Sequence, residues 1–345
     1  MKIGYLYDAA FIRWVLVFFL VLYHAFAPFS GAWAPIDSYP EIRAYWWFDN
    51  LCYACLLEAF VFVSGYTFGF QRITRGEAVL DFGSLFRSKF KRLIIPCMVF
   101  SLLYILLFQD IHQPLGKTIY GLFNGVGHLW FLPMLFWCFF IVWIVEKLSI
   151  KPHWTLILAL VSAIFSFLSL PLEIGRTMYY FLFFYTGYLI KREEISLEKY
   201  NSVWVVILLA ISFAVLFPLI TMVLQHLQNL KESDILINKA ISALCNICKM
   251  IRASAGLLLL FFSAGLIVKN KKGLFPSWIV NVGGLCMGIY IFQQFILKAL
   301  YYYTTLPKIL SHYWLPWVGF AVALVSSALL TYLLRLTKAG RFILG

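Results

Sequence analysis

Two ionisable residues, Arg13 and His24, stand eleven positions apart in an otherwise apolar run near the start of the chain. In a helix, eleven residues make nearly three turns, so both side chains lie on one face, roughly 16 Å apart. A guanidinium binds anionic oxygens, and a neutral imidazole can remove a proton from a hydroxyl group. Taken singly, each residue could equally be an interfacial anchor or a packing residue. Their shared face favours a stripe with an anion site at one end and a general base at the other.

Glu58 is the candidate partner of His24. It lies in the segment LLEAFVFVSGY, in a second apolar run that returns through the bilayer, at a depth that matches that of His24. A carboxylate beside an imidazole fixes its tautomer and stabilises the imidazolium formed when it takes a proton. The alternative is a structural partner for Glu58 elsewhere. Ser64 in the same run is interpreted as a packing residue, with a nucleophile as the alternative.

Lys89 and Arg92 belong to a basic cluster in the segment FRSKFKRLIIP, at the boundary of a third apolar run. Such a cluster can hold phosphate groups. It can equally set membrane topology and attract anionic lipid, which is the ordinary role of an isolated cluster. Its expected position beside the Arg13 end of the stripe favours the phosphate interpretation.

Four residues of the opposite side are candidates for binding an acceptor: His128, Trp130, Tyr290 and Gln293. Aromatic faces and amide groups suit a sugar, although they are also ordinary interface and interhelical residues. The pairs Cys52-x-x-Cys55 and Cys245-x-x-Cys248 could bind zinc or form disulfides. Because cysteine is also common as a small apolar residue, we predict no metal site.

The elements that position these residues must be membrane helices. The chain has 345 residues, 63% of them hydrophobic and 12% charged, with a mean hydropathy of +0.86, which exceeds what a soluble core can bury. The formal net charge is +13, but Lys and Arg fall mainly in short loops. That distribution is a topology signal and argues against nucleic-acid binding.

The apolar runs predict an all-α polytopic membrane protein with about ten transmembrane helices and one membrane-embedded domain over residues 1–345. Basic residues concentrate on one side, which puts both termini in the cytoplasm. The first run is expected to be retained rather than cleaved. The connection 226–252 has helical spacing of apolar residues and is a candidate amphipathic helix on the outer surface. The predicted helices are 9–29, 52–71, 93–109, 128–146, 154–172, 177–190, 203–225, 251–268, 279–300 and 314–334.

Five segments, taken in order, resemble the acyltransferase 3 family of bacterial membrane O-acyltransferases, including its fucose O-acetylase-like branch. They are Arg13-x10-His24, FVFVSGY, KFKRLIIP, HLWFLPMLF and GLCMGIYIFQQF. Arg13 and His24 match the family's paired Arg and His. Lys89-x-x-Arg92 resembles its basic motif, often written with Arg at both ends, and a lysine there binds as a point charge rather than bidentately. Gln293 stands where many members have His.

The resemblance implies a multi-pass enzyme of the bacterial cytoplasmic (inner) membrane that takes acetyl-CoA, or a longer acyl-CoA such as succinyl-CoA, as donor substrate and needs no permanently bound cofactor. The implied acceptor is a hydroxyl of a cell-surface or lipid-linked glycan. The sequence shows no appended extracytoplasmic domain of the kind that some members carry. Transfer is therefore expected to finish within the membrane domain or on a separate partner.

The mechanism expected from these residues has Arg13, Lys89 and Arg92 hold the donor's phosphates. His24, supported by Glu58, then removes a proton from the attacking hydroxyl or forms a covalent acyl intermediate. The alternative is a transporter or flippase for a polysaccharide precursor or anionic solute, with the buried ionisable groups as a proton relay. No repeated halves or matched broken helices support it. A structural or sensory membrane protein would leave the stripe on the first helix without a role.

Overall fold

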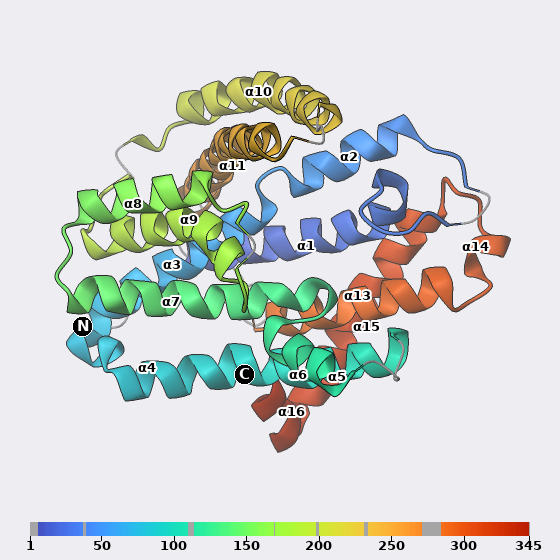
Figure 1. Ribbon diagram of the computed structural model, residues 1–345, viewed down its shortest axis with the longest axis horizontal. Helices are drawn as coiled ribbons and strands as arrows, with labels where there is room; N and C mark the ends of the chain where they lie inside the picture. The colour runs from blue at the N-terminus through green and yellow to red at the C-terminus, as the bar shows by residue number, and fades with distance from the viewer. Residues whose placement is uncertain are drawn as a thin grey trace.

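The computed structural model describes residues 6–36, 39–109, 114–168, 170–197, 200–230, 234–270 and 284–344. Within these ranges every regular element is a helix, which confirms the predicted all-α class. Figure 1 shows most of the helices lying along the long axis of the molecule. The longer helices are α1 (Tyr7–Ser30), α3 (Leu56–Arg75), α5 (Ile95–Phe108), α7 (Phe131–Lys147), α8 (Pro152–Ile164), α9 (Ile174–Arg192), α10 (Val203–Asn229), α11 (Ile235–Asn270), α13 (Cys286–Tyr302) and α15 (Leu315–Leu336). The shorter ones are α2 (Arg43–Tyr53), η1 (Gly76–Leu80), α4 (Phe82–Lys89), η2 (Phe90–Ile94), α6 (Leu115–Asn124), η3 (Gly127–Trp130), α14 (Leu306–Ile309) and α16 (Lys338–Ile343).

Seven helical stretches of the described chain are long and apolar enough to cross a bilayer, so the protein is polytopic. Each of the ten predicted runs overlaps a helix, although the run 279–300 begins in residues outside the described ranges. Three helices, α8, α9 and α13, are too short or too polar to count among the seven. The number ten therefore stays a prediction. The seven stretches are Tyr7–Ser30, Arg43–Leu80, Phe82–Phe108, Gly127–Lys147, Val203–Asn229, Ile235–Val268 and Leu315–Leu336.

The connection 226–252 is helical up to Asn229 and from Ile235 onward, but its described residues do not form a separate surface helix. Helix α10 continues to Asn229, and α11 begins at Ile235 and runs without interruption to Asn270. Its apolar spacing belongs to one long helix whose first turn is highly exposed, with Ile235 at 72%. Helical periodicity continues unchanged where a helix leaves the bilayer. The spacing of apolar residues therefore does not show where a membrane helix ends and a surface helix begins.

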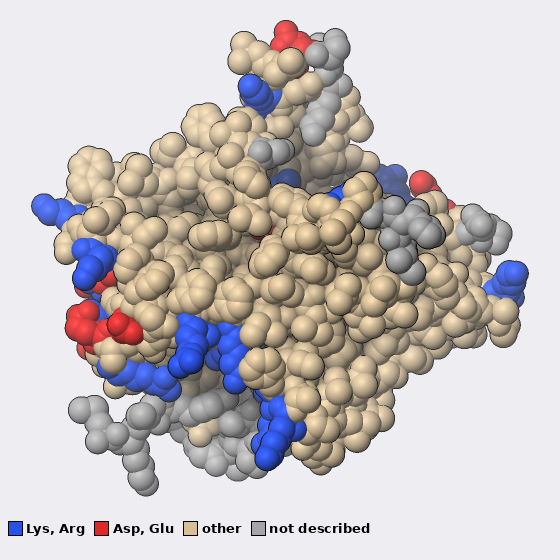
Figure 2. All heavy atoms as spheres, turned by 60° about the horizontal axis from the view of Figure 1, so that its bottom comes forward, with Lys and Arg blue, Asp and Glu red and all other residues tan. Residues whose placement is uncertain are grey.

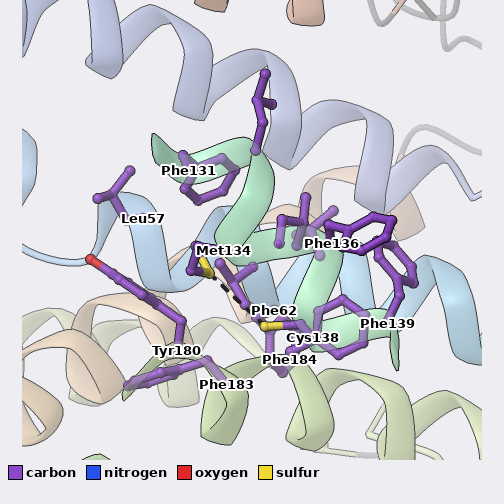
Figure 3. Packing of buried hydrophobic residues seen from close by; sticks show 14 of the residues in the cluster. Leu57, Phe62, Phe131, Met134, Phe136, Cys138, Phe139, Tyr180, Phe183 and Phe184 are labelled. Atoms are coloured by element: carbon purple, nitrogen blue, oxygen red, sulfur yellow. Dashed lines mark hydrogen bonds between the residues drawn. The ribbon is translucent and has the colours of Figure 1, made fainter. Parts of the chain in front are cut away.

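Helix α7 lies in the centre of the bundle and α10 at its edge. In the most apolar window of the α7 stretch 72% of the residues are buried, against 6% in α10. Figure 3 shows the packing around α7. The ring of Phe139 there meets Phe184 of α9 and Phe68 of α3, with centroids 4.9 Å and 5.0 Å away. The exposed side of α10 carries large apolar residues such as Trp204 and Leu208. Such a face suits contact with lipid tails.

Helix α3 packs most extensively against α9, because glycines let the two backbones approach closely. A Cβ atom on Gly187 would collide with the backbone oxygen of Phe62, and one on Gly65 with that of Phe184. The SGY segment of the sequence is thus a packing motif of α3. This contact fixes the face that α3 presents to α1 and α7.

Charged side chains are sparse over most of the face drawn in Figure 2. Lys and Arg gather mainly toward the left and lower centre of that view, and a broad uncharged surface lies between the groups. This distribution is expected of a protein whose middle contacts hydrocarbon and whose ends contact water and lipid headgroups.

Candidate active site

Three predicted cations, Arg13, Lys89 and Arg92, line one cavity of about 300 Å³, here called the cation cavity. They come from α1, α4 and η2, so helices far apart in the chain supply them. The Arg13 guanidinium donates a hydrogen bond of 2.6 Å to Thr67 Oγ1, and Thr67 in turn donates to the Val63 carbonyl at 2.7 Å. Thr67 therefore orients Arg13 from the α3 side.

Lys89 is buried, with 9% of its side chain exposed. Its Nζ lies 3.7 Å from the ring centroid of Phe139 and 5.2 Å from that of Phe68. Among the described residues no salt bridge includes Lys89 or Arg92. The positive charges of Arg92 and Arg13 act on Lys89, so the three groups repel one another. An anion in the cavity would relieve that repulsion.

The segment that carries Arg92 is a π-helical stretch between α4 and α5. Pro96 follows at the start of α5; it has no backbone N–H, and its ring would crowd the carbonyl four residues earlier. Widening the helix over Phe90–Ile94 accommodates the proline without ending the helix. The KFKRLIIP segment therefore forms a local bulge that directs Arg92 into the cation cavity.

His24 lines a second cavity of about 320 Å³, here called the His24 cavity. Three of the four predicted acceptor-side residues, His128, Trp130 and Tyr290, line it too. The fourth, Gln293, is fully buried behind the wall and contacts His24. Residues Gly127–Trp130 form the short helix η3, and its first residue, Gly127, has φ +63°, where a side chain would also crowd Tyr104. The loop places His128 opposite His24, with their ring centroids 6.1 Å apart.

Four residues line both cavities: Leu20, Leu57, Phe131 and Tyr290. They come from α1, α3, α7 and α13 and are here called the junction. Figure 3 shows two of them, Leu57 and Phe131, near one another at the end of α7. The cation cavity and the His24 cavity are therefore neighbours separated by the same side chains. Arg13 and His24 lie on opposite sides of this layer, as their positions on one helix face predict.

Gln293 and the backbone of Leu20 both contact the His24 ring. The Nε2 of Gln293 lies 2.9 Å from His24 Nδ1, and its Oε1 is buried without a hydrogen-bond partner. An amide nitrogen only donates, so in this orientation Nδ1 accepts and the ring proton sits on Nε2. With the amide turned over, Oε1 accepts from Nδ1–H and Nε2 presents a lone pair. The second orientation is the one that a general base requires.

His128 is held on both sides by α13. Its Nδ1 contacts Gln294 Oε1, its Nε2 lies 3.0 Å from the Ile291 carbonyl, and Tyr290 OH donates to the His128 carbonyl at 2.6 Å. Both ring nitrogens are thus engaged, which makes His128 a fixed part of the wall. The hydrogen bond between His24 and Gln293 uses Nδ1 and leaves Nε2 out of it. Of the two histidines, His24 is therefore the one available to a substrate.

Glu58 does not pair with His24. Its Oε1 accepts a hydrogen bond of 3.1 Å from Tyr179 OH, and the positive charge of Arg252 acts on it. Neither cavity has Glu58 in its lining, whereas the preceding Leu57 belongs to the junction. Consecutive helical residues point about 100° apart, so equal depth with His24 did not imply the same face. Ser64 lines the cation cavity, away from His24, and donates to the Phe60 carbonyl at 2.8 Å.

Several residues of the His24 cavity were missed in the sequence, among them Trp33, Tyr104 and Lys298. Trp33 stacks on the His24 ring with centroids 5.6 Å apart and an interplanar angle of 26°. Lys298 lies four residues after Gln294 on α13, and this spacing places the two on one helix face. That spacing was a usable signal. Trp33 lies beyond the end of α1, where no periodicity predicts a direction.

Trp130 is held by an ion pair outside the cavity. The Arg176 guanidinium lies 4.2 Å from the Trp130 ring centroid and pairs with Glu173 at 3.0 Å. Asn124 Nδ2 donates to Glu173 Oε1 at 2.7 Å. Burial raises the pKa of the Glu173 carboxyl, while Arg176 and Asn124 act in the opposite direction. The chain of contacts fixes one aromatic face of the His24 cavity.

The seven cysteines are free thiols, so the two Cys-x-x-Cys pairs form no disulfide in this structure. Among the described residues no group of three or more His, Cys, Asp and Glu has an arrangement that could hold a metal ion. The buried cysteines, such as Cys97 and Cys138, pack within the helix core.

Comparison with known proteins gives one match. No curated protein and no solved structure matches the chain. A family model described as an acyltransferase domain, that of acyltransferase 3, matches residues 7–336. The matched range runs from the start of α1 to the end of α15 and includes every residue of both cavities except Leu344. The chain therefore belongs to the acyltransferase 3 family and is a membrane acyltransferase.

Proposed function

We propose that this acyltransferase moves an acetyl group from cytoplasmic acetyl-CoA to a hydroxyl of a cell-surface or lipid-linked glycan, in the cytoplasmic membrane of a bacterium. The observation that carries the proposal is the pair of cavities that share the junction, with cations in one and His24 in the other. Acyl-CoA is too highly charged to cross a bilayer. A donor held in one cavity can react with an acceptor in the other without itself crossing the bilayer.

The donor belongs in the cation cavity. Its phosphates are anions, and Arg13, Lys89 and Arg92 are cations that repel one another when the cavity holds no anion. The wall from there to the junction is largely apolar, with Phe60 and Leu135 among its residues. Such a wall suits the slender pantetheine arm, and it directs the thioester toward the junction. This assignment requires both termini to be cytoplasmic, as the distribution of basic residues predicts.

The reaction proceeds from the acceptor side. His24 Nε2 takes the proton of the acceptor hydroxyl, and the oxygen attacks the thioester carbonyl carbon. The C–O bond of the new ester forms and the C–S bond breaks. The thiolate of CoA leaves and takes up the proton that His24 holds, which regenerates the base. Gln293 Oε1 holds Nδ1–H during this step. Glu58 has no part in it, because its partner is Tyr179. A variant of this scheme transfers the acyl group first to His24.

The test uses the full chain in liposomes with labelled acetyl-CoA, with and without a crude lipid-linked glycan fraction. The wild type should label the glycan, and His24→Ala should lower transfer about 10²- to 10⁴-fold, the usual contribution of a general base. His153→Ala is the matched control, because His153 is exposed on α8. It should transfer at the wild-type rate.

Full transfer by His24→Ala at an unchanged protein level would contradict both versions of the mechanism. Label that stays on the wild-type protein without glycan, and is absent from His24→Ala, distinguishes the covalent version from direct transfer. Movement of an anionic solute across the liposome membrane without use of acetyl-CoA would favour the transporter alternative.

A further inference from the structure

Among the described residues that line the His24 cavity, Lys298 is the one cationic side chain and none is a carboxylate. Its lining is otherwise aromatic, aliphatic, amide and imidazole. The hydroxyl groups of a neutral sugar need acceptors, and a carboxylate can accept from two of them at once. The described wall has no Asp or Glu to do so. The described lining therefore offers a sugar aromatic faces and one cation, but no carboxylate acceptor.

Lys298 is partly buried on α13 and points between two aromatic rings. Its Nζ lies 5.0 Å from the ring centroid of Tyr104 and 5.6 Å from that of Trp33. Trp33 also stacks on His24, so the Lys298 ammonium group and the His24 imidazole both contact the Trp33 ring. Among the described residues no hydrogen bond or ion pair involves Lys298.

An ammonium group at this depth is costly unless it is compensated. The two rings offset part of the cost by cation–π attraction, and an anion would offset more. The cost also bears on catalysis. The charge of Lys298 acts on His24, so it opposes the positive charge that His24 gains when it takes a proton. A bound anion would neutralise Lys298 and remove that opposition.

We propose that the acceptor carries an anionic oxygen group, a carboxylate or a phosphate, which binds Lys298 while the acceptor hydroxyl faces His24. The proposal rests on the proposed function, because it names the chemical class of the acceptor. An acidic sugar would supply a carboxylate, and a lipid-linked sugar would supply the phosphate. In either case the anion both anchors the acceptor and permits His24 to become an imidazolium. A neutral sugar would neither anchor to Lys298 by charge nor offset its charge when His24 takes a proton.

The experiment measures binding by saturation-transfer NMR on the full chain in nanodiscs. The probes are methyl glucoside, methyl glucuronide and glucose 1-phosphate, which share a ring and differ in charge. At least one anionic probe should bind on the order of 10-fold more tightly than the glucoside, as expected of a charge-assisted hydrogen bond. Whichever anion binds identifies the source, carboxylate or phosphate.

Lys298→Gln should lower the affinity of that anion to the level of the glucoside, and Lys298→Arg should restore most of the preference. Lys308→Gln is the matched control, because Lys308 is exposed on α14 and does not line the cavity. It should keep the full preference. Equal binding of all three probes by the wild type, no binding of either anion, or a preference that survives in Lys298→Gln would each overturn the inference.

The same protein is assayed for acetyl transfer to the glycan fraction. Anion binding that depends on Lys298, without any acetyl transfer, refutes the proposed function but supports the anion site at Lys298. Acetyl transfer without anion preference refutes the inference alone. The two proposals can therefore fail independently.

Discussion

The orientation of the Gln293 side-chain amide decides which nitrogen of His24 carries the proton. As Gln293 lies in the structure, its amide nitrogen donates to His24 and its oxygen is buried without a partner. A buried carbonyl oxygen without a donor costs about 1 to 3 kcal/mol. Turning the amide over gives that oxygen the Nδ1–H of His24 and frees Nε2 as a base. A residue with both a donor and an acceptor can thus hold His24 in either tautomer.

Substituting Gln293 tests this role. Gln293→Leu should lower kcat for acetyl transfer about tenfold, because a hydrogen bond worth roughly 1.5 kcal/mol no longer orients the base. The KM for acetyl-CoA should stay near the wild-type value, since Gln293 does not line the cation cavity. Gln293→Glu, which accepts only, should restore most of kcat. Steady-state kinetics in liposomes gives both constants.

The control for this series is Gln228→Leu, because Gln228 is exposed on α10. It should match the wild type in both constants. A Gln293→Leu variant that raises KM and leaves kcat unchanged would show that Gln293 supports the shape of the bundle rather than the base.

Sequence reasoning placed the site residues in two groups, and the structure brings both groups together. It worked for Arg13 and His24 because spacing on one helix fixes both face and separation. It failed for the pairing of His24 with Glu58, where two helices were compared by depth alone. The rotation of α3 about its own axis is set by its close contact with α9 through Gly65, and the sequence does not reveal which helix this glycine faces.

At the scale of elements, α9 shows how a helix packed inside this bundle can be less apolar than a lipid-facing membrane helix. It is nineteen residues long but contains Arg, Thr and several Tyr, and it packs against α3, α7 and α8. A helix enclosed by other helices has little contact with lipid, so its side chains need not be strongly apolar. The predicted run 177–190 captured most of it by position. The length of α11 was missed because its pattern does not change at the surface.

The contact of α3 with α9 should be sensitive to the size of one side chain. Gly187→Leu places a bulky group against the backbone of Phe62 and should lower the free energy of unfolding by about 1 to 3 kcal/mol or more, the usual cost of overpacking. The expected observation is a lower melting temperature of the purified protein in detergent. Acetyl transfer should fall with it, since α3 carries both Leu57 and Thr67.

Gly116→Leu is the matched change on α6, where no atom lies within 4 Å of an added Cβ. Its melting temperature should equal that of the wild type, because an exposed substitution usually changes stability by less than about 0.5 kcal/mol. Equal melting of Gly187→Leu and Gly116→Leu would show that the helix pair separates easily, contrary to the packing described here.

At the scale of the whole molecule, the four junction side chains decide what passes between the cavities. Phe131 is the largest apolar member and lies at the first position of α7. Phe131→Ala should open the layer and let water reach the thioester. We expect a severalfold rise in acetyl-CoA hydrolysis without acceptor, measured by release of the CoA thiol. Phe165→Ala, at an exposed position after α8, should leave hydrolysis at the wild-type rate.

An unchanged rate of hydrolysis in Phe131→Ala, with the variant folded as judged by its melting temperature, would show that another group separates donor from acceptor. Tyr290 would then be the next residue to change, since its hydroxyl ties the junction to η3 through the His128 carbonyl.

The junction also bears on the electrical tightness of the membrane. Two water-filled hollows that meet inside a bilayer would form a pore and dissipate the proton-motive force. Leu20, Leu57, Phe131 and Tyr290 present hydrocarbon and ring surface at the point where the hollows meet, and narrow apolar constrictions shed water. In the proposed mechanism, the layer of side chains that separates donor from acceptor therefore also blocks the flow of ions across the membrane.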